Sequence, residues 1–290
     1  MIPAQASRTA FRVALRRATH QLLDVPPVFV DPVAIDILGP DTAAELRADP
    51  ASFDDSRFGP AMRAFMAVRA RFAEEQLAAG RAAGVRQLVI LGAGLDTFAY
   101  RANLDEPPLA VWEVDHPATQ AWKREMLAAA GLAVPARLRF AAIDFTREPL
   151  ADVLAASGFD ARAGAVFSWL GVTQYLVADD VFATLRYIAG ATAAGGGVTF
   201  DYSVAPQLLS LTERWAYDAL AARVRAAGEP WLSAFVPDEL VAQLRACGFR
   251  AVRDVSPEEL RERYLAGRTD RLRLGRLARL IWAGADLYGA

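Results

Sequence analysis

The chain contains few of the residue types on which many catalytic and structural sites depend. Its single cysteine, Cys247, excludes an intramolecular disulfide and any metal cluster built on cysteines. Its only histidines are His20 and His116, so neither a hydrolase triad nor a metal site is predicted. Lysine occurs once, at Lys123, and arginine carries the rest of the positive side-chain charge. Candidate sites must therefore be sought among glycine, carboxylate, arginine and aromatic residues.

Long apolar runs and a strong net charge are also absent. The longest uncharged run, residues 163–178, contains polar residues and is too short to span a membrane. The formal net charge of -2 favours neither nucleic acid nor an anionic membrane as a partner. With one cysteine and no apolar leader, the chain is expected in the reducing cytoplasm. Four arginines near the N-terminus superficially resemble a transit peptide: Arg8, Arg12, Arg16 and Arg17. Their helical spacing favours a surface helix instead.

What the chain does contain indicates an α/β protein. With 290 residues and 54% hydrophobic content, it is long enough for one large domain over residues 1–290. From residue 87 onward, apolar strand patterns alternate with amphipathic helices such as Pro117–Ala130 and Asp179–Ala193. This alternation predicts a mostly parallel sheet with helices on both faces. The predicted strands are Gln87–Leu91, Ala110–Val114, Leu138–Ile143, Gly164–Trp169, Gly197–Tyr202, Phe249–Val255 and Leu277–Ala283.

The domain divides into four predicted parts. Residues 1–85 contain only helical patterns and are expected to form a cap over the sheet. Residues 86–205 form a cofactor-binding core, residues 206–230 a second piece of the cap, and residues 231–290 the rest of the sheet. The predicted helices of the cap are Ser7–Leu23, Pro32–Ile37, Pro60–Ala83 and Pro206–Ala227.

A glycine motif follows the first predicted strand. Gly92 and Gly94 let the backbone approach a ligand closely, and the following helix directs its free N–H groups to the same place. Asp115 ends the next strand roughly 20 residues on, where such folds hold a ribose diol. Thr97 replaces the third glycine of the dinucleotide fingerprint, which favours another nucleoside cofactor over NAD. An ordinary turn followed by a solvated acid is the alternative.

An acid also follows the third strand. Asp144 could accept a hydrogen bond from the exocyclic amine of adenine, and Phe145 offers a backbone N–H and an aromatic face. The alternative is that Asp144 caps the following helix.

Arg69 interrupts the apolar stripe of the helix Pro60–Ala83. A guanidinium on a buried face needs an anion. That anion is either a protein carboxylate in a structural ion pair or a carboxylate of the ligand.

Taken together, these motifs resemble the class I S-adenosylmethionine-dependent methyltransferases, and more narrowly the bacterial relatives of the leucine carboxyl methyltransferases. The resemblance extends over nearly the whole chain. Its motifs are Ala67–Phe72, Leu91–Thr97 with Tyr100 and Arg101, Trp112–Pro117 with Lys123, Ile143–Phe145, Trp169–Leu176 and Arg263–Arg268. It implies a Rossmann-like seven-stranded sheet whose last strand is antiparallel, with an N-terminal helical cap, and S-adenosylmethionine as the methyl donor.

The resemblance also implies roles for individual residues. Arg69 would hold the methionine carboxylate of the cofactor, and we expect it to lack a protein partner when no cofactor is bound. Gly92 and Gly94 would lie under the methionine moiety. Asp115 would bind the ribose, with Glu113 as the second choice.

The adenine end of the cofactor would meet Asp144 and Phe145.

Members related to the eukaryotic enzymes have an acid after the fourth strand, where this chain has Leu170. A backbone carbonyl would then have to meet the amino group of the cofactor.

The resemblance implies in-line transfer of a methyl group to a small molecule. A carboxylate acceptor needs no base, whereas a hydroxyl acceptor does. Tyr175, Asp201 and Tyr202 lie near the ends of the fourth and fifth strands and are weak catalytic candidates, because packing or loop hydrogen bonding explains each of them better. A non-catalytic binder of the same cofactor and an NAD-dependent oxidoreductase are the alternatives. The acceptor and the oligomeric state do not follow from the sequence.

Overall fold

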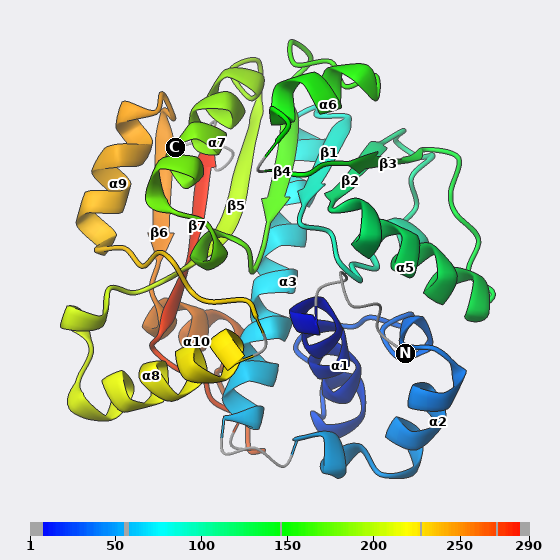
Figure 1. Cartoon of the computed structure of the whole chain (residues 1–290), viewed down its shortest axis with the longest axis vertical. Coiled ribbons are helices and arrows are strands. Elements are labelled where there is room, and N and C mark those ends of the chain that lie inside the picture. The colour runs from blue at the N-terminus through cyan, green and yellow to red at the C-terminus, as the bar shows by residue number, and fades with distance from the viewer. Residues whose placement is uncertain (1–7, 55–57, 146, 227, 271, 285–290) are drawn as a thin grey trace.

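The computed structural model describes residues 8–54, 58–145, 147–226, 228–270 and 272–284 (Figure 1). Seven strands form one sheet in the order β3-β2-β1-β4-β5-β7-β6. Six strands run in one direction and β7 runs opposite to them, which confirms the predicted fold class. The strands are β1 (Gln87–Leu91), β2 (Ala110–Asp115), β3 (Leu138–Ala142), β4 (Ala165–Trp169), β5 (Gly196–Ser203), β6 (Ala251–Val255) and β7 (Ala278–Gly284).

The central strands are apolar because they are covered on both faces. In β1, Leu88 and Ile90 join one hydrophobic cluster, whereas Val89 and Leu91 join the cluster on the opposite face. Side chains of a strand alternate between the two faces, so a strand buried on both sides reads as a continuous apolar run. This is why the apolar run at Leu88–Leu91 identified an inner strand correctly.

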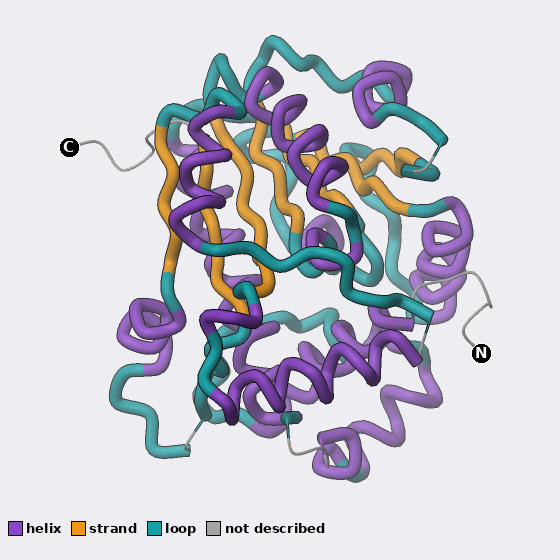
Figure 2. Tube along the Cα trace, turned by 60° about the vertical axis from the view of Figure 1, so that its left-hand side comes forward, coloured by secondary structure: helices purple, strands orange, loops and turns teal. Residues whose placement is uncertain are grey.

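Helices cover both faces, as Figure 2 shows. Leucines of α6 (Leu150–Ala156), α7 (Ala178–Ala191) and α9 (Pro237–Ala246) pack on the face of Val89. On the face of Ile90 lie α3 (Gly59–Ala82) and α10 (Pro257–Leu265). The same face is extended by α4 (Phe98–Arg101) and α5 (Pro117–Ala129). The sheet therefore lies between two layers of helices.

The long helix α3 connects the cap to the sheet. It packs against α1 (Arg8–Leu23), and farther along its length Phe72 and Leu77 enter the core of the sheet. At Gly80 the helix comes so close to β4 that an added Cβ would lie 2.7 Å from Val166. Arg69 lies between these two parts of α3, and the helix thus fixes its position relative to the ends of the strands.

Two expectations for the cap need correction. The predicted helix Pro32–Ile37 is a turn followed by the 3₁₀ helix η1 (Asp36–Leu38), and the α-helix is the next segment, α2 (Pro40–Ala48). Proline at the first position of α2 suits a helix start, because its missing N–H would have no partner there. Helix α1 is not simply a surface helix, because Arg17 and His20 are buried.

The remaining described elements are short or peripheral. The predicted helix Pro206–Ala227 is observed as η4 (Pro206–Leu208) followed by α8 (Leu211–Ala226). The other 3₁₀ helices are η2 (Pro50–Asp54) and η3 (Thr173–Tyr175). Within the described ranges, no helix combines the length and the apolar character that crossing a membrane requires.

Candidate functional site

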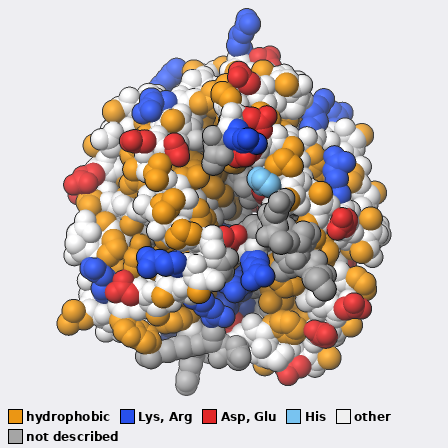
Figure 3. Space-filling view, in the orientation of Figure 1, with side chains coloured by type: hydrophobic (Ala, Val, Ile, Leu, Met, Phe, Trp, Pro, Cys, Tyr) orange, Lys and Arg blue, Asp and Glu red, His pale blue; other side chains and the backbone are white. Residues whose placement is uncertain are grey.

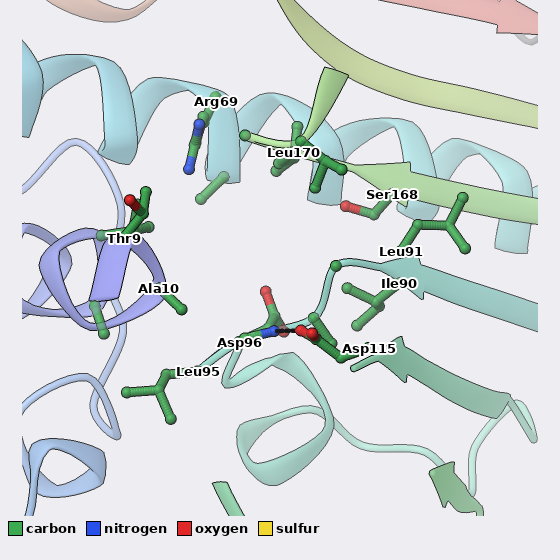
Figure 4. Close-up of a pocket in the computed structure, with 18 of the residues that line it drawn as sticks. Thr9, Ala10, Arg69, Ile90, Leu91, Leu95, Asp96, Asp115, Ser168 and Leu170 are labelled. Atoms are coloured by element: carbon green, nitrogen blue, oxygen red, sulfur yellow. Dashed lines mark hydrogen bonds between the residues drawn. The ribbon is translucent and has the colours of Figure 1, made fainter. Parts of the chain in front are cut away.

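A cavity of about 510 Å³ opens at the carboxyl ends of β1, β2, β3 and β4. The strand order reverses between β1 and β4, which is where open α/β sheets leave a crevice for ligands. The space-filling view shows the molecule hollowed near the centre of this face, with acidic and basic side chains beside the opening (Figure 3). Residues from the strand ends form one wall, and residues of α1 and α3 form the other (Figure 4). Residues of the segment 228–232 also belong to this second wall.

The glycine loop, residues 92–96, is part of the strand-end wall of the cavity. Gly92 and Gly94 have φ values of 66° and 46°, in the region that glycine adopts readily. A Cβ at Gly92 would lie 2.4 Å from Val172, and one at Gly94 would lie 2.9 Å from Ala10 of α1. The lack of side chains at both positions lets the loop fit closely between β4 and the cap.

Asp115 lies beside this loop and lines the cavity. One carboxylate oxygen accepts a hydrogen bond from the Gly94 N–H at 2.6 Å (Figure 4), and the other accepts one from the His116 N–H at 2.7 Å. Burial raises the pKa of this carboxyl above its ordinary value, although both N–H donors oppose that effect. Each oxygen has a second lone pair for a ligand hydroxyl. The carboxylate thus has the position and the hydrogen-bonding capacity expected of a ribose-binding acid.

Glu113, the second choice for the ribose, lies elsewhere. Its side chain is buried in the core and forms an ion pair with Lys123 at 2.6 Å. The Tyr100 hydroxyl also donates to it at 3.4 Å. Burial raises the pKa of Glu113 to about 7, against the opposing effect of Lys123. The only lysine of the chain thus neutralises a core acid, and this pair lies outside the residues that line the cavity.

Asp144 and Phe145 follow β3 and line the cavity. Phe145 is 37% exposed, so its ring is available to a ligand. Asp144 does not cap α6, because the N-cap of that helix is Pro149. Its backbone carbonyl instead accepts the N–H groups of Arg147 and Glu148 in a turn. The capping alternative is therefore wrong.

Arg69 projects from α3 into the cavity (Figure 4). Its Nη1 atom donates to Asp201 Oδ2 at 2.9 Å, and both side chains are buried. The expectation that Arg69 lacks a protein partner in the absence of cofactor is wrong. A guanidinium with so little exposed surface is stable only with a counterion, and Asp201 of β5 supplies one.

The three weak catalytic candidates occupy different environments. Tyr175 lines the cavity. Asp201 has its carboxylate engaged by Arg69 and by the Gly171 N–H at 2.5 Å, so it lies behind the cavity wall. Tyr202 is buried in the core, where its hydroxyl donates to Asp254 at 3.0 Å. Of the three, only Tyr175 is placed to meet a ligand.

The sequence analysis missed a charged network on the cap wall. Arg17 of α1 donates to Asp31 at 2.6 Å and to Thr97 at 2.5 Å, and Thr97 donates to Asp31 at 2.6 Å. Arg101 lies 3.5 Å from Asp31 and also pairs with Glu74 of α3. Burial opposes ionisation of Asp31, but Arg17 and Arg101 outweigh it and lower its pKa. The replacement of the third glycine by Thr97 was the one available signal for this network.

The segment after α8 closes the cavity from the side of the cap. Gly228, Pro230 and Leu232 line the cavity, and the Thr9 N–H donates to Glu229 at 3.2 Å. The Leu232 N–H donates to the Gln174 carbonyl at 2.6 Å, which ties this segment to the loop after β4. The predicted second piece of the cap thus contributes to the site mainly through the residues that follow its helix.

Comparison with known proteins identifies the family. Residues 10–189 match the family model described as leucine carboxyl methyltransferase. The chain is 29% identical over 287 residues to the putative S-adenosyl-L-methionine-dependent methyltransferase YktD of Bacillus subtilis, with 92% of this chain and 94% of the relative covered. A relative from Mycobacteroides abscessus with the same description is 36% identical over 208 residues, which is 69% of this chain and 66% of that protein. Other relatives match over about half of their own length.

Solved structures share the fold. A putative methyltransferase from Thermobifida fusca superposes with a TM-score of 0.52 and 20% identity, covering 94% of each chain. A DUF574 family protein from Streptomyces avermitilis gives a TM-score of 0.54 at 15% identity, with 98% of this chain and all of that chain covered. At this level of identity the likeness concerns the fold alone.

Proposed function

The chain belongs to the leucine carboxyl methyltransferase family and is an S-adenosylmethionine-dependent methyltransferase, and we propose that it methylates an oxygen atom of a small molecule. The family description, a carboxyl methyltransferase, supports an oxygen acceptor. The observation that supports binding of the methyl donor is the convergence of a glycine loop, an acid, an aromatic residue and a buried arginine on one cavity. These groups match the loop, ribose, adenine and carboxylate contacts that such a cofactor requires.

The residues present fit the cofactor by their chemistry. The backbone at Gly92 and Gly94 leaves no room for side chains between the loop and its neighbours. Asp115 would accept the ribose hydroxyls, and Phe145 would pack against the adenine ring, with Asp144 accepting from its amine. Arg69 would bind the carboxylate with the donors that Asp201 leaves available. The cofactor supplies an electrophilic methyl group on a sulfonium.

The protein contributes positioning and exclusion of water to the transfer. An in-line displacement is accelerated when the two reactants are held in the reacting geometry in a dry site. Helix α1 and residues 228–232 cover the cavity opposite the strand ends, where an acceptor would be shielded from water. If the acceptor is a hydroxyl, Tyr175 is the cavity-lining candidate for hydrogen bonding to it or for accepting its proton.

Calorimetric titration tests the cofactor assignment. We expect S-adenosylmethionine and S-adenosylhomocysteine to bind and NAD to give no heat of binding. A methyl-transfer assay with alcohols, phenols, carboxylic acids and amines as acceptors then tests which kind of atom is methylated. Binding of NAD in preference to both sulfur nucleosides would contradict the assignment, and methylation confined to nitrogen acceptors would contradict the proposed oxygen acceptor.

A further inference from the structure

Asp201 lies at the junction of three elements next to the proposed cofactor site. It belongs to the carboxyl half of β5, and only 5% of its side chain is exposed. One carboxylate oxygen accepts from Arg69 of α3 and the other from the Gly171 N–H in the loop after β4. Its backbone carbonyl accepts from the Thr173 hydroxyl at 2.7 Å. A single residue thus fixes the arginine and the loop on either side of it.

The contact with Asp201 leaves most of the Arg69 guanidinium available. Asp201 engages Nη1, and a planar guanidinium has five N–H donors. The guanidinium also packs against Gly171, where an added Cβ would lie 2.9 Å from both Nη1 and Nη2. The contacts with Asp201 and with the bare backbone of Gly171 therefore hold the guanidinium so that it projects into the cavity (Figure 4).

Asp201 also orients the peptide bond between Leu170 and Gly171. In a trans peptide, the C=O and the N–H point in opposite directions. Because the Gly171 N–H points to the buried Asp201, the Leu170 carbonyl points away from it, to the side where Leu170 lines the cavity. The Leu170 side chain cannot accept a hydrogen bond, so this carbonyl is the acceptor that the residue can offer to an ammonium group.

We propose that Asp201 is a positioning residue that prepares the site for the amino-acid group of the cofactor. It holds Arg69 for the carboxylate and the Leu170 carbonyl for the ammonium. The inference rests on the proposed function, since it assumes that a cofactor with an amino-acid group enters this cavity. It differs from a catalytic role because Asp201 lies outside the cavity lining and touches neither cofactor nor acceptor.

Two ligands separate this role from a merely structural one. S-adenosylhomocysteine carries the amino-acid group, whereas 5′-methylthioadenosine has the same nucleoside and sulfur without it. We expect Asp201→Asn to lower the affinity for S-adenosylhomocysteine at least tenfold and to leave that for 5′-methylthioadenosine within about twofold. Calorimetry on the full chain, with a thermal melt to verify folding, measures both affinities.

A matched control and a second variant complete the experiment. Asp254 is another largely buried carboxylate with an arginine partner, Arg279 at 2.7 Å, so Asp254→Asn should change neither affinity. If Asp201→Asn does not fold, Gly171→Ala places a Cβ against the Arg69 guanidinium and displaces it, and we expect the same selective loss.

Equal losses for both ligands, or none, would overturn the inference while the proposed function stands. If the wild-type chain binds neither ligand, the proposed function fails, and the inference fails with it.

Discussion

The two walls of the cavity use charge in opposite ways. On the cap wall, Arg17, Arg101, Asp31 and Glu74 neutralise one another. On the strand-end wall, Asp115 is bonded only to backbone N–H groups and has no cationic side chain paired with it in the described chain. This network of four residues therefore joins α1 and α3 to the glycine loop and leaves Arg69 as the cap-wall cation that faces the ligand, whereas Asp115 keeps its hydrogen-bonding capacity for a ligand.

The same contrast exists within one strand. Glu113 and Asp115 lie two residues apart on the same face of β2. Glu113 faces Lys123 in the core, and Asp115 faces the cavity at the end of the strand. Burial raises the pKa of both carboxyls. The position along the strand, more than the residue type, therefore decides whether an acid of β2 forms a core ion pair or faces the cavity.

The largest expected change in free energy comes from disrupting the ion-pair network of the cap wall. Asp31→Asn removes the negative charge shared by Arg17 and Arg101, and loss of one partner from a buried network costs about 3–5 kcal/mol of unfolding free energy. Urea unfolding measures this loss. Asp36→Asn is the control, because its pair with Arg47 is about half exposed and such pairs contribute less than about 1 kcal/mol. Similar losses in the two variants would show that the network does not hold the cap.

The buried pair of Glu113 and Lys123 should make the free energy of unfolding depend on pH. The pKa of Glu113 rises from 4.5 to about 7 on folding, so the folded state binds more protons between these values. Its contribution to stability is thus complete below about pH 4.5 and is lost as the pH rises through 7, by up to about 3 kcal/mol. Unfolding free energies measured from pH 4.5 to 8 should show this decline. In the double variant Glu113→Gln, Lys123→Met the decline should be absent, and a persistent slope would assign it to other groups.

A substitution in the strand-end wall should lower the affinity for the cofactor more than the stability of the fold. Hydrogen bonds to a charged group contribute about 1.5–3 kcal/mol, so Asp115→Ala should weaken S-adenosylhomocysteine binding at least tenfold. Calorimetry measures this change. The Glu113→Gln, Lys123→Met variant serves as the control, because its pair lies outside the cavity lining and its affinity should stay close to that of the wild type. Unchanged affinity in Asp115→Ala would remove Asp115 from the ribose site.

The smallest expected effect concerns the adenine end. Phe145→Leu keeps an apolar side chain but removes the aromatic face, which contributes about 0.5–1.5 kcal/mol in aromatic pairs. We therefore expect a loss of S-adenosylhomocysteine affinity of about two- to tenfold, measured by the same titration. The melting temperature should change little, because Phe145 is partly exposed. A loss as large as that of Asp115→Ala would mean that Phe145 also orders the loop after β3.

The strands, the order of the helices and the glycine loop could be predicted because their causes are local. The continuous apolar run of β1 and the glycines at its end reflect burial on two faces and close backbone approach, which a sequence records directly. The cap was harder. Pro32–Ile37 has a helical pattern but contributes only a turn and a 3₁₀ helix, and the α-helix begins at Pro40 after Gly39.

The sequence by itself determined the α/β fold class, the family resemblance and the candidate cofactor residues at the strand ends. Only the tertiary structure decided which charged residues meet. Arg69 and Asp201 are 132 positions apart, and Arg101 and Glu74 are 27 apart. No local pattern links such positions, because a buried ion pair forms wherever the packing of helices on a sheet brings opposite charges together out of water. For the same reason, the sequence could place Glu113 and Asp115 on one face of the strand but could not show their different partners. Lys123 of α5 pairs with Glu113, whereas Asp115 lines the cavity.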